Sequence, residues 1–209
     1  MGDAAGPGAA GGASGGGGGR RLPGAGLSAR RAGGPSAEPA AFGHTLGFCR
    51  RGDRVLMVRR TRPPFAGRWN GVGGKLQPGE PPADGMLREI GEETPLQPAD
   101  LGPIRRIGGV RWTQLAEDPP ASGGMHVFLA PARASLHTWE GTEPSSEGEL
   151  SWLPLRDVVD PANPRVVRNI ARFLPAMLRR PGLTFHCDYR GEELISVRRL
   201  SGSEAEAAR

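Results

Sequence analysis

Three glutamates near the middle of the chain are spaced so that one short helix would bring them together. Glu89, Glu92 and Glu93 stand at positions i, i+3 and i+4 within the segment from Gly73 to Leu96, and such positions share one face of a helix. Crowded carboxylates at the C-terminal end of a helix repel one another and oppose the helix dipole. A bound cation would relieve both effects, so this spacing predicts a metal site.

The ligand type indicates which metal. Mg²⁺ takes carboxylate oxygens from a few residues, keeps several waters and commonly bridges to substrate phosphates. We therefore expect Mg²⁺, with Mn²⁺ as an alternative, and a substrate that carries phosphate groups. The competing interpretation is a solvated acidic helix face, which is the usual meaning of a run of charges.

A helix from about Pro82 to Glu93 would hold these carboxylates in place. Met86, Leu87 and Ile90 then fall on the face opposite the glutamates, where they can be buried. The segment before this helix is rich in glycine, and a glycine lets the backbone approach an ion or a phosphate closely. The sequence thus predicts an amphipathic helix that follows a tight glycine turn.

This segment resembles the signature box of the Nudix hydrolases, which cleave nucleoside diphosphates linked to another group. The pattern is Gly74, five residues, Glu80, seven residues and then residues 88–93, Arg-Glu-Ile-Gly-Glu-Glu. The chain departs from it once, with Pro95 where the family has a glycine, before the expected aliphatic Leu96. Because proline can also end a helix, we interpret this departure as a local variant of the helix exit.

The resemblance implies the Nudix fold, an α/β/α sandwich with a mixed β-sheet, and an enzyme that uses Mg²⁺ to hydrolyse a nucleoside triphosphate to the monophosphate and pyrophosphate. The implied metal ligands are the carbonyl of Gly73 and the side chains of Glu89, Glu92, Glu93 and Glu147. Glu89 is our first choice for the general base, ahead of Glu92 and Glu147. Arg88 belongs to the catalytic motif, and its guanidinium can orient a glutamate rather than contact substrate.

Segments on either side of the box are similar to MutT-type members, which remove oxidised purine nucleotides. In that resemblance Arg60 holds phosphates, Asn70 contacts the base or ribose, and Asn163 recognises an oxidised purine such as that of 8-oxo-dGTP. An amide suits the last role because it both donates and accepts hydrogen bonds. Asn169 is a weaker candidate for it.

Each of these assignments has a plainer alternative. Arg60 can be a solvated strand end, and Asn163 can cap a helix that begins at Pro164. Glu149 can replace Glu147 if the register differs. We interpret Trp69 as part of the core rather than as a platform for a base. His44 and His126 are interpreted as structural.

The rest of the chain supplies the predicted elements of an α/β fold. Two hairpins are expected, over residues 42–60 around Gly52-Asp53 and over residues 183–199 around Arg190-Gly191. Further strands are expected in residues 103–115, in residues 123–133 and from Leu150 to Leu155. A second helix is expected over residues 166–180, because its apolar residues repeat with helical period.

We expect three regions: a disordered Gly/Ala/Arg-rich tail over residues 1–41, a Nudix domain over 42–198 and a flexible tail over 199–209. The 209-residue chain carries a formal charge of +5, much of it arginine in the flanking segments. With 5% aromatic residues there is little for stacking bases along a groove. We expect a small nucleotide as partner and no stable nucleic-acid partner.

No apolar run has membrane-spanning length, and the two cysteines match neither a disulfide framework nor a zinc spacing. We expect no membrane partner and a cytoplasmic location; the oligomeric state stays unknown. Two alternatives for function also stay open. One is a Nudix hydrolase for dinucleoside polyphosphates or nucleotide sugars, and the other is a noncatalytic module that binds nucleotide or RNA.

Overall fold

The strands belong to one mixed sheet, which a computed structural model of the chain describes over residues 42–133 and 141–206. The predicted tail over residues 1–41 lies outside the described residues. The strands are β1 Phe42–Arg51, β2 Arg54–Arg60, β3 Trp69–Asn70, β4 Arg105–Gln114, β5 Ala121–Pro131, β6 Glu143–Ser145, β7 Gly148–Pro154, β8 Leu183–Arg190 and β9 Glu193–Arg199. The helices are α1 Pro82–Glu93, α2 Leu155–Val158, α3 Ile170–Arg179 and α4 Gly202–Glu206, with a 3-10 turn at Pro98–Asp100.

The sheet has the order β6-β7-β2-β1-β5-β4-β8-β9, and β3 pairs with β2. The pairs β1–β5 and β4–β8 are parallel, and the remaining pairs are antiparallel. A mixed sheet with helices confirms the predicted α/β class. Both predicted hairpins are present, and Gly52 and Gly191 have φ of 60° in their turns, a conformation that glycine adopts without steric cost.

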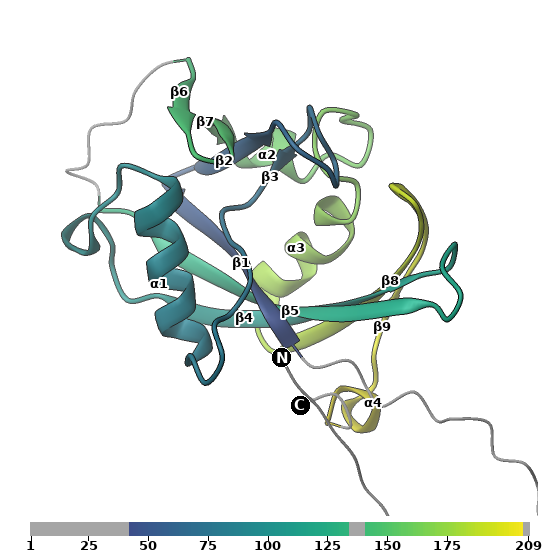
Figure 1. The fold of residues 1–209 in the computed structure, drawn as a ribbon. Helices are drawn as coiled ribbons and strands as arrows, with labels where there is room; N and C mark the ends of the chain where they lie inside the picture. Colours follow the sequence, from purple (N-terminus) through teal and green to yellow (C-terminus); the bar gives the residue numbers. More distant parts are fainter. Residues whose placement is uncertain (1–41, 134–140, 207–209) are drawn as a thin grey trace, which may run out of the picture. The chain divides into compact units, whose positions relative to one another are not determined.

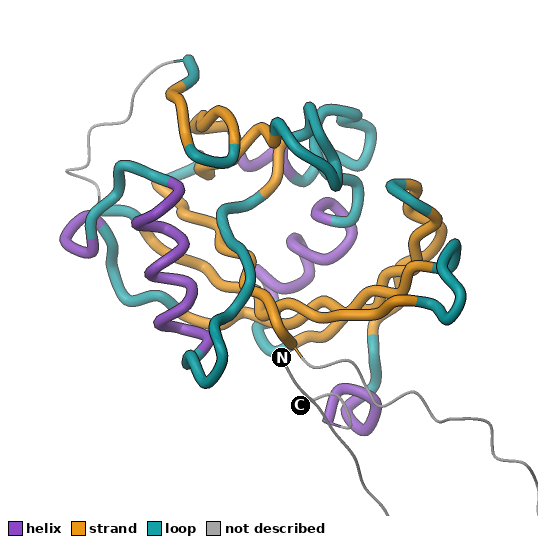
Figure 2. Tube along the Cα trace, viewed as in Figure 1, coloured by secondary structure: helices purple, strands orange, loops and turns teal. Residues whose placement is uncertain are grey.

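Alternating side chains on the central strands divide the core in two. On β2, Val55 and Met57 pack with α3, whereas Leu56 and Val58 pack with α1. This is the consequence of the two-residue period of a strand whose two faces are both covered. Figures 1 and 2 show β1 running between α1 and α3. The cavity described below lies beside β1 as well.

Helix α1 has the predicted bounds, but the prediction for its buried face was partly wrong. Met86 and Ile90 are fully buried, while Leu87 is 38% exposed. Glu89 and Glu93 are buried on the same side as Met86 and Ile90. Positions 86, 90 and 93 follow the i, i+4, i+7 spacing of one helical face, so two of the glutamates accompany the apolar residues instead of opposing them.

Helix α3 begins later than predicted, and Asn163 does not cap it. The helix starts at Ile170, after Asn169. Residues 165–167 pair with Trp69 instead: the Trp69 N–H donates to the Arg165 carbonyl at 2.7 Å, and the Val167 N–H donates to the Trp69 carbonyl at 3.0 Å. These backbone groups are therefore used between segments and not within a helix.

The C-terminal segment forms the short helix α4, where the sequence predicted fraying after Ser201. The Glu204 carboxylate accepts from the Ser201 N–H at 2.9 Å and pairs with Arg198 at 2.9 Å. None of the helices formed by the described residues has the length and apolar content needed to cross a membrane.

Candidate active site

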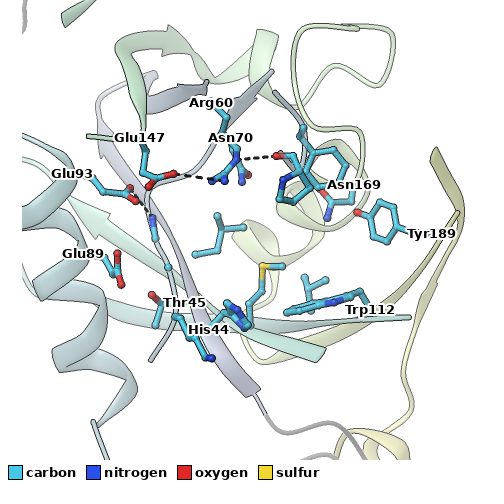
Figure 3. A pocket seen from close by; sticks show the side chains of 18 of the residues that line it. His44, Thr45, Arg60, Asn70, Glu89, Glu93, Trp112, Glu147, Asn169 and Tyr189 are labelled. Carbon is cyan, nitrogen blue, oxygen red and sulfur yellow. Dashed lines mark hydrogen bonds and ion pairs between the residues drawn. The ribbon is translucent and has the colours of Figure 1, made fainter. Parts of the chain in front are cut away.

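A cavity of about 580 Å³ lies between the end of α1 and the strands β4 and β8. Its size is within the range of small-molecule sites. Acidic and aromatic side chains line its two sides: Glu89 and Glu93 lie on one side and Trp112 and Tyr189 on the other (Figure 3). We call these the acidic end, formed by Glu89, Glu93 and Glu147, and the aromatic end, formed by Phe65, Trp112 and Tyr189.

The three box glutamates do not share one environment. Glu89 and Glu93 are 8% and 7% exposed and line the cavity. Glu92 is exposed, with 58% of its side chain accessible, and it is not among the lining residues. Since 89 and 93 are one turn apart, the helix directs them toward the cavity and leaves Glu92 at its outer edge.

The glycine turn before α1 is shaped around these carboxylates. Gly73 has φ of 147°, and a Cβ there would stand 2.3 Å from the Thr45 carbonyl oxygen. Its N–H donates to Glu93 Oε2 at 3.1 Å. At Gly74 a Cβ would stand 2.6 Å from the Glu89 carboxylate. The absence of a side chain therefore lets Gly73 lie against the backbone of β1, and at Gly74 it leaves room for the Glu89 carboxylate.

Arg88 holds the outer side of the acidic end. Its Nε and Nη2 donate to the two oxygens of Glu80 at 2.8 and 3.0 Å, a bidentate pair. Its Nη1 donates to Glu89 at 2.9 Å and to Glu92 at 3.1 Å, and Nη2 also donates to the Lys75 carbonyl at 3.1 Å. Arg88 is absent from the cavity lining, so this geometry agrees with a guanidinium that orients carboxylates.

Burial sets the protonation of the two cavity glutamates. Loss of solvation raises the pKa of Glu93 to about 7, with further raising by the carboxylates of Glu89 and Glu147, against the lowering by the Gly73 N–H and Arg60. Burial also raises the pKa of Glu89, and Arg88 partly offsets this. A cation in the cavity would favour the ionised form of both groups.

The donor set fits a hard divalent cation that takes few protein ligands. Among the described residues, no group of three or more His, Cys, Asp or Glu side chains is arranged to hold a metal. Mg²⁺ does not need one, because it is commonly bound by one or two carboxylates together with waters and substrate phosphates. The buried carboxylates of Glu89 and Glu93, beside the glycine turn, match that requirement.

Arg60 and Glu147 face each other across the mouth of the cavity. Arg60 ends β2, and its Nη2 lies 3.6 Å from the Glu147 carboxylate, while its Nε donates to the Pro64 carbonyl at 2.9 Å. Both residues line the cavity. Glu149, the alternative to Glu147, does not line it and instead pairs with Arg59. The structure thus places a guanidinium and a third carboxylate at the cavity.

The three candidate asparagines have different positions. Asn70 and Asn169 line the cavity, and Asn169 is only 6% exposed. Asn163 does not line it. The Asn163 amide donates to the Asp157 carbonyl at 2.9 Å and its oxygen accepts from the Arg165 N–H at 3.1 Å. Asn163 thus holds a turn outside the cavity lining, whereas Asn169 lines the cavity; recognition of a base by either residue stays a prediction.

The aromatic end was missed in the sequence. Trp112 and Gln114 alternate on β4 and pair in register with Cys187 and Tyr189 of β8, and all except Cys187 line the cavity. Phe65 comes from the loop before β3. The alternation of Trp112 and Gln114 could have indicated that they share one face of the sheet, but no pattern in the sequence indicates that β4 and β8 are adjacent strands. Trp69 is in the core as predicted.

Three buried polar atoms of residues that line the cavity have no hydrogen-bond partner among the described residues. They are Nδ1 of His44, the hydroxyl of Thr45 and Oε1 of Gln114. A buried polar atom without a partner costs about 1–3 kcal/mol. A polar ligand or water in the cavity would remove that cost.

His126, the other histidine considered in the sequence, does not line the cavity, and its ring stacks on that of Phe42 with the centroids 4.9 Å apart.

Comparison with known proteins gives consistent matches. A family model described as the NUDIX domain matches residues 43–177. The oxidized purine nucleoside triphosphate hydrolase of Mus musculus is 34% identical over 87 residues, covering 42% of this chain and 53% of that protein. The protein of the same name from Danio rerio is 28% identical over 153 residues, covering 72% of this chain and 88% of that protein.

A solved structure shows the same fold. The mutator MutT protein of Bacillus halodurans superposes with a TM-score of 0.59 at 23% identity, over 75% of this chain and 95% of that chain. The match to the mouse relative spans only about half of that protein, so its name alone does not fix this chain's activity. Since the NUDIX domain model covers more than half of the chain, the chain belongs to the Nudix family.

Proposed function

We propose that this chain is a hydrolase that cleaves nucleoside triphosphates to the monophosphate and pyrophosphate with a divalent cation, Mg²⁺ first, and that it prefers oxidised purine nucleotides such as 8-oxo-dGTP. The observation that carries the proposal is one cavity with buried carboxylates at one end and aromatic and amide side chains at the other. A nucleotide has the complementary form, with a phosphate chain at one end and a flat base at the other.

The acidic end would act on the phosphates. Glu89 and Glu93, with the Gly73 carbonyl and with Glu92 and Glu147 at the rim, would hold the cation. When bound, Mg²⁺ neutralises charge that grows on the phosphate oxygens and acidifies a coordinated water. Arg60, whose guanidinium lies 3.6 Å from the Glu147 carboxylate, would contact the phosphates beside that residue.

The proton of the attacking water would pass to a carboxylate, and Glu89 is our choice. Water attacks the α- or the β-phosphorus, the bridging P–O bond between the α- and β-phosphates breaks, and the leaving group, pyrophosphate or monophosphate respectively, keeps the bonding electrons. Glu89 suits this role because burial raises its pKa, which makes it a better proton acceptor. Arg88 would keep it oriented through the 2.9 Å hydrogen bond.

The aromatic end would take the base. Asn70 and Asn169 can donate to and accept from its edge. The names of the mouse and zebrafish relatives support an oxidised purine as the group attached to the phosphates.

The test is turnover by the purified full chain with MgCl₂ across 8-oxo-dGTP, dGTP, a dinucleoside polyphosphate and a nucleotide sugar, with pyrophosphate and monophosphate as the products measured. We expect 8-oxo-dGTP to have the highest kcat/KM and EDTA to abolish turnover. Faster cleavage of the dinucleoside polyphosphate or the nucleotide sugar would mean that the proposed substrate is wrong. No turnover together with tight RNA binding would mean that the protein is a binding module and not an enzyme.

A variant checks the role of the exposed box glutamate. Glu92→Gln should lower turnover by orders of magnitude with the fold intact, since the change removes a charge at the cavity edge and no core contact. Wild-type turnover in this variant would remove Glu92 from the proposed cation site.

A further inference from the structure

The hairpin formed by β8 and β9 follows the residues that the NUDIX domain model matches, which end at 177. It nevertheless contributes Tyr189 to the lining of the cavity. β8 pairs in parallel with β4, and this places Tyr189 opposite Gln114 and two residues from the Trp112 pair. Figure 3 shows Tyr189 and Trp112 on the side of the cavity away from Glu89 and Glu93.

The residues at the turn of this hairpin are hydrogen-bonded both to the end of β4 and to the loop that carries Phe65. The Gln114 side chain donates to the Gly191 carbonyl at 2.7 Å, and the Leu115 N–H donates to the Tyr189 carbonyl at 2.7 Å. On the other edge, the Phe65 N–H donates to the Glu192 carboxylate at 2.5 Å. The hairpin therefore connects β4 to the loop before β3.

Phe65 is held in an uncommon conformation where it meets the hairpin. Its φ is 65°, in the left-handed region that residues other than glycine rarely adopt. Its ring lies 5.8 Å from the ring of Tyr189 at an interplanar angle of 54°. Such a tilted pair is a favourable arrangement of two aromatic rings. The bond to Glu192 and this ring contact together fix where the loop stands.

We propose that Tyr189 is a specificity-determining residue that contacts the flat base of the bound nucleotide, and that Glu192 positions the opposing Phe65. The inference rests on the proposed function, because it assigns a nucleotide to this cavity. Tyr189 is 5% exposed and still lines the cavity, so its position there is fixed by packing. The width of the aromatic end then depends on a segment outside the matched domain.

The experiment measures binding of the nucleoside monophosphate 8-oxo-dGMP with MgCl₂ by calorimetry, because this product of the proposed reaction is not turned over. Tyr189→Leu keeps apolar volume without a ring, and Tyr189→Phe keeps the ring. We expect Tyr189→Leu to weaken binding roughly tenfold, as expected for loss of a ring contact with a base, and Tyr189→Phe to retain wild-type affinity. Inorganic pyrophosphate, which has no base, should bind both variants as it binds wild type.

A second variant avoids any change in the core. Glu192→Ala removes the acceptor for Phe65 on an exposed turn, and we expect it to weaken 8-oxo-dGMP binding several-fold. Ile195→Ala is the matched control, because Ile195 lies on the same hairpin and is 44% exposed away from the cavity lining. Thermal unfolding of each variant checks that it is folded.

Unchanged 8-oxo-dGMP affinity in folded Tyr189→Leu and Glu192→Ala overturns the inference, and so does an equal loss of pyrophosphate affinity. If wild type hydrolyses nucleotides and these variants bind normally, only this inference fails. If wild type binds 8-oxo-dGMP through Tyr189 but hydrolyses no nucleotide, the proposed function fails and the inference stands. Failure of wild type to bind 8-oxo-dGMP overturns the inference, whereas the proposed function is decided separately by turnover of 8-oxo-dGTP.

Discussion

The two ends of the cavity are built in opposite ways. Most of the acidic end comes from one continuous segment, since Gly73, Glu89 and Glu93 lie within 21 residues of one another. The aromatic end brings together Phe65, Trp112 and Tyr189 from three distant parts of the chain. A local helix and its preceding turn determine the first, whereas the sheet order determines the second.

The two ends of the cavity should therefore respond differently to substitution of their side chains. The acidic end depends on hydrogen bonds of fixed geometry around Arg88 and Gly73, so replacing one group should remove chemistry and leave binding largely intact. The aromatic end depends on packed faces, so replacing one side chain should weaken binding by a graded amount. The predictions below test this contrast, beginning with the largest effect.

The largest loss is expected for Glu93→Gln, which keeps the shape of a buried side chain and removes its charge. We expect kcat for 8-oxo-dGTP to fall roughly 10²-fold or more, as for loss of a charged group that stabilises the transition state, with a much smaller change in KM. Steady-state kinetics measure this. Glu117→Gln is the control, since Glu117 is exposed and outside the cavity. A rise in KM at constant kcat would contradict the proposed chemistry of the acidic end.

Arg88→Lys should give the next largest effect, because lysine cannot form the bidentate pair with Glu80 while also reaching Glu89. We expect kcat to fall roughly 10- to 100-fold, with little change in KM. Arg156→Lys is the matched control, since the Arg156 side chain is 82% exposed. Wild-type kcat in Arg88→Lys would show that the guanidinium fork does not orient the glutamates.

Asn169, which lines the cavity, and Asn163, which does not, should behave differently when each is replaced. Asn169→Ala should raise KM for 8-oxo-dGTP roughly tenfold, because it removes a buried amide that faces the cavity. Asn163→Ala should leave KM unchanged and lower the free energy of unfolding by about 1 kcal/mol through its lost turn hydrogen bonds. Denaturant unfolding and steady-state kinetics measure the pair. The reverse result would restore Asn163 as the residue that recognises the base.

The smallest expected effect is a loss of stability at acidic pH. Hydrogen bonds from Arg88, and then the Gln77 N–H, lower the pKa of Glu80 to about 2. A carboxyl whose folded pKa lies below its unfolded value of 4.5 stabilises the fold above pH 4.5 and loses that contribution as pH falls toward 2. The difference in melting temperature between wild type and Glu80→Gln should therefore shrink over this range. A constant difference would mean that ionisation of Glu80 does not stabilise the fold.

The same contrast explains how much the sequence could predict. The bounds of α1 and the two hairpins follow from spacing within short segments, and the structure has them where they were expected. The Arg88 guanidinium also contacts glutamates, as expected, while the role of the Gly73 carbonyl as a metal ligand stays a prediction. The start of α3 was wrong because residues 165–167 pair with Trp69, a contact nearly a hundred residues away in sequence. Tyr189 was missed for the same reason, since only the parallel β4–β8 pair places it at the cavity.

Burial within α1 was mispredicted for a different reason. The sequence predicts a buried face with Leu87 on it and with Glu89 and Glu93 on the opposite face, whereas the structure buries the two glutamates and exposes Leu87. One face of α1 is buried, and part of that face lines the cavity, where carboxylates can be accommodated. A hydrophobicity pattern cannot distinguish a helix face that contacts only the core from one that also lines a cavity.

The alternation along β1 links the two halves of the protein. Leu46 and Phe48 belong to the core beneath α3, whereas Cys49 belongs to the core beneath α1. A shift of this strand by one residue would exchange its partners on both faces together, so neither half can rearrange while the other stays native. Because β1 contributes to both cores, we expect them to unfold together, so that Glu89 and Glu93 lose their buried positions when the domain unfolds.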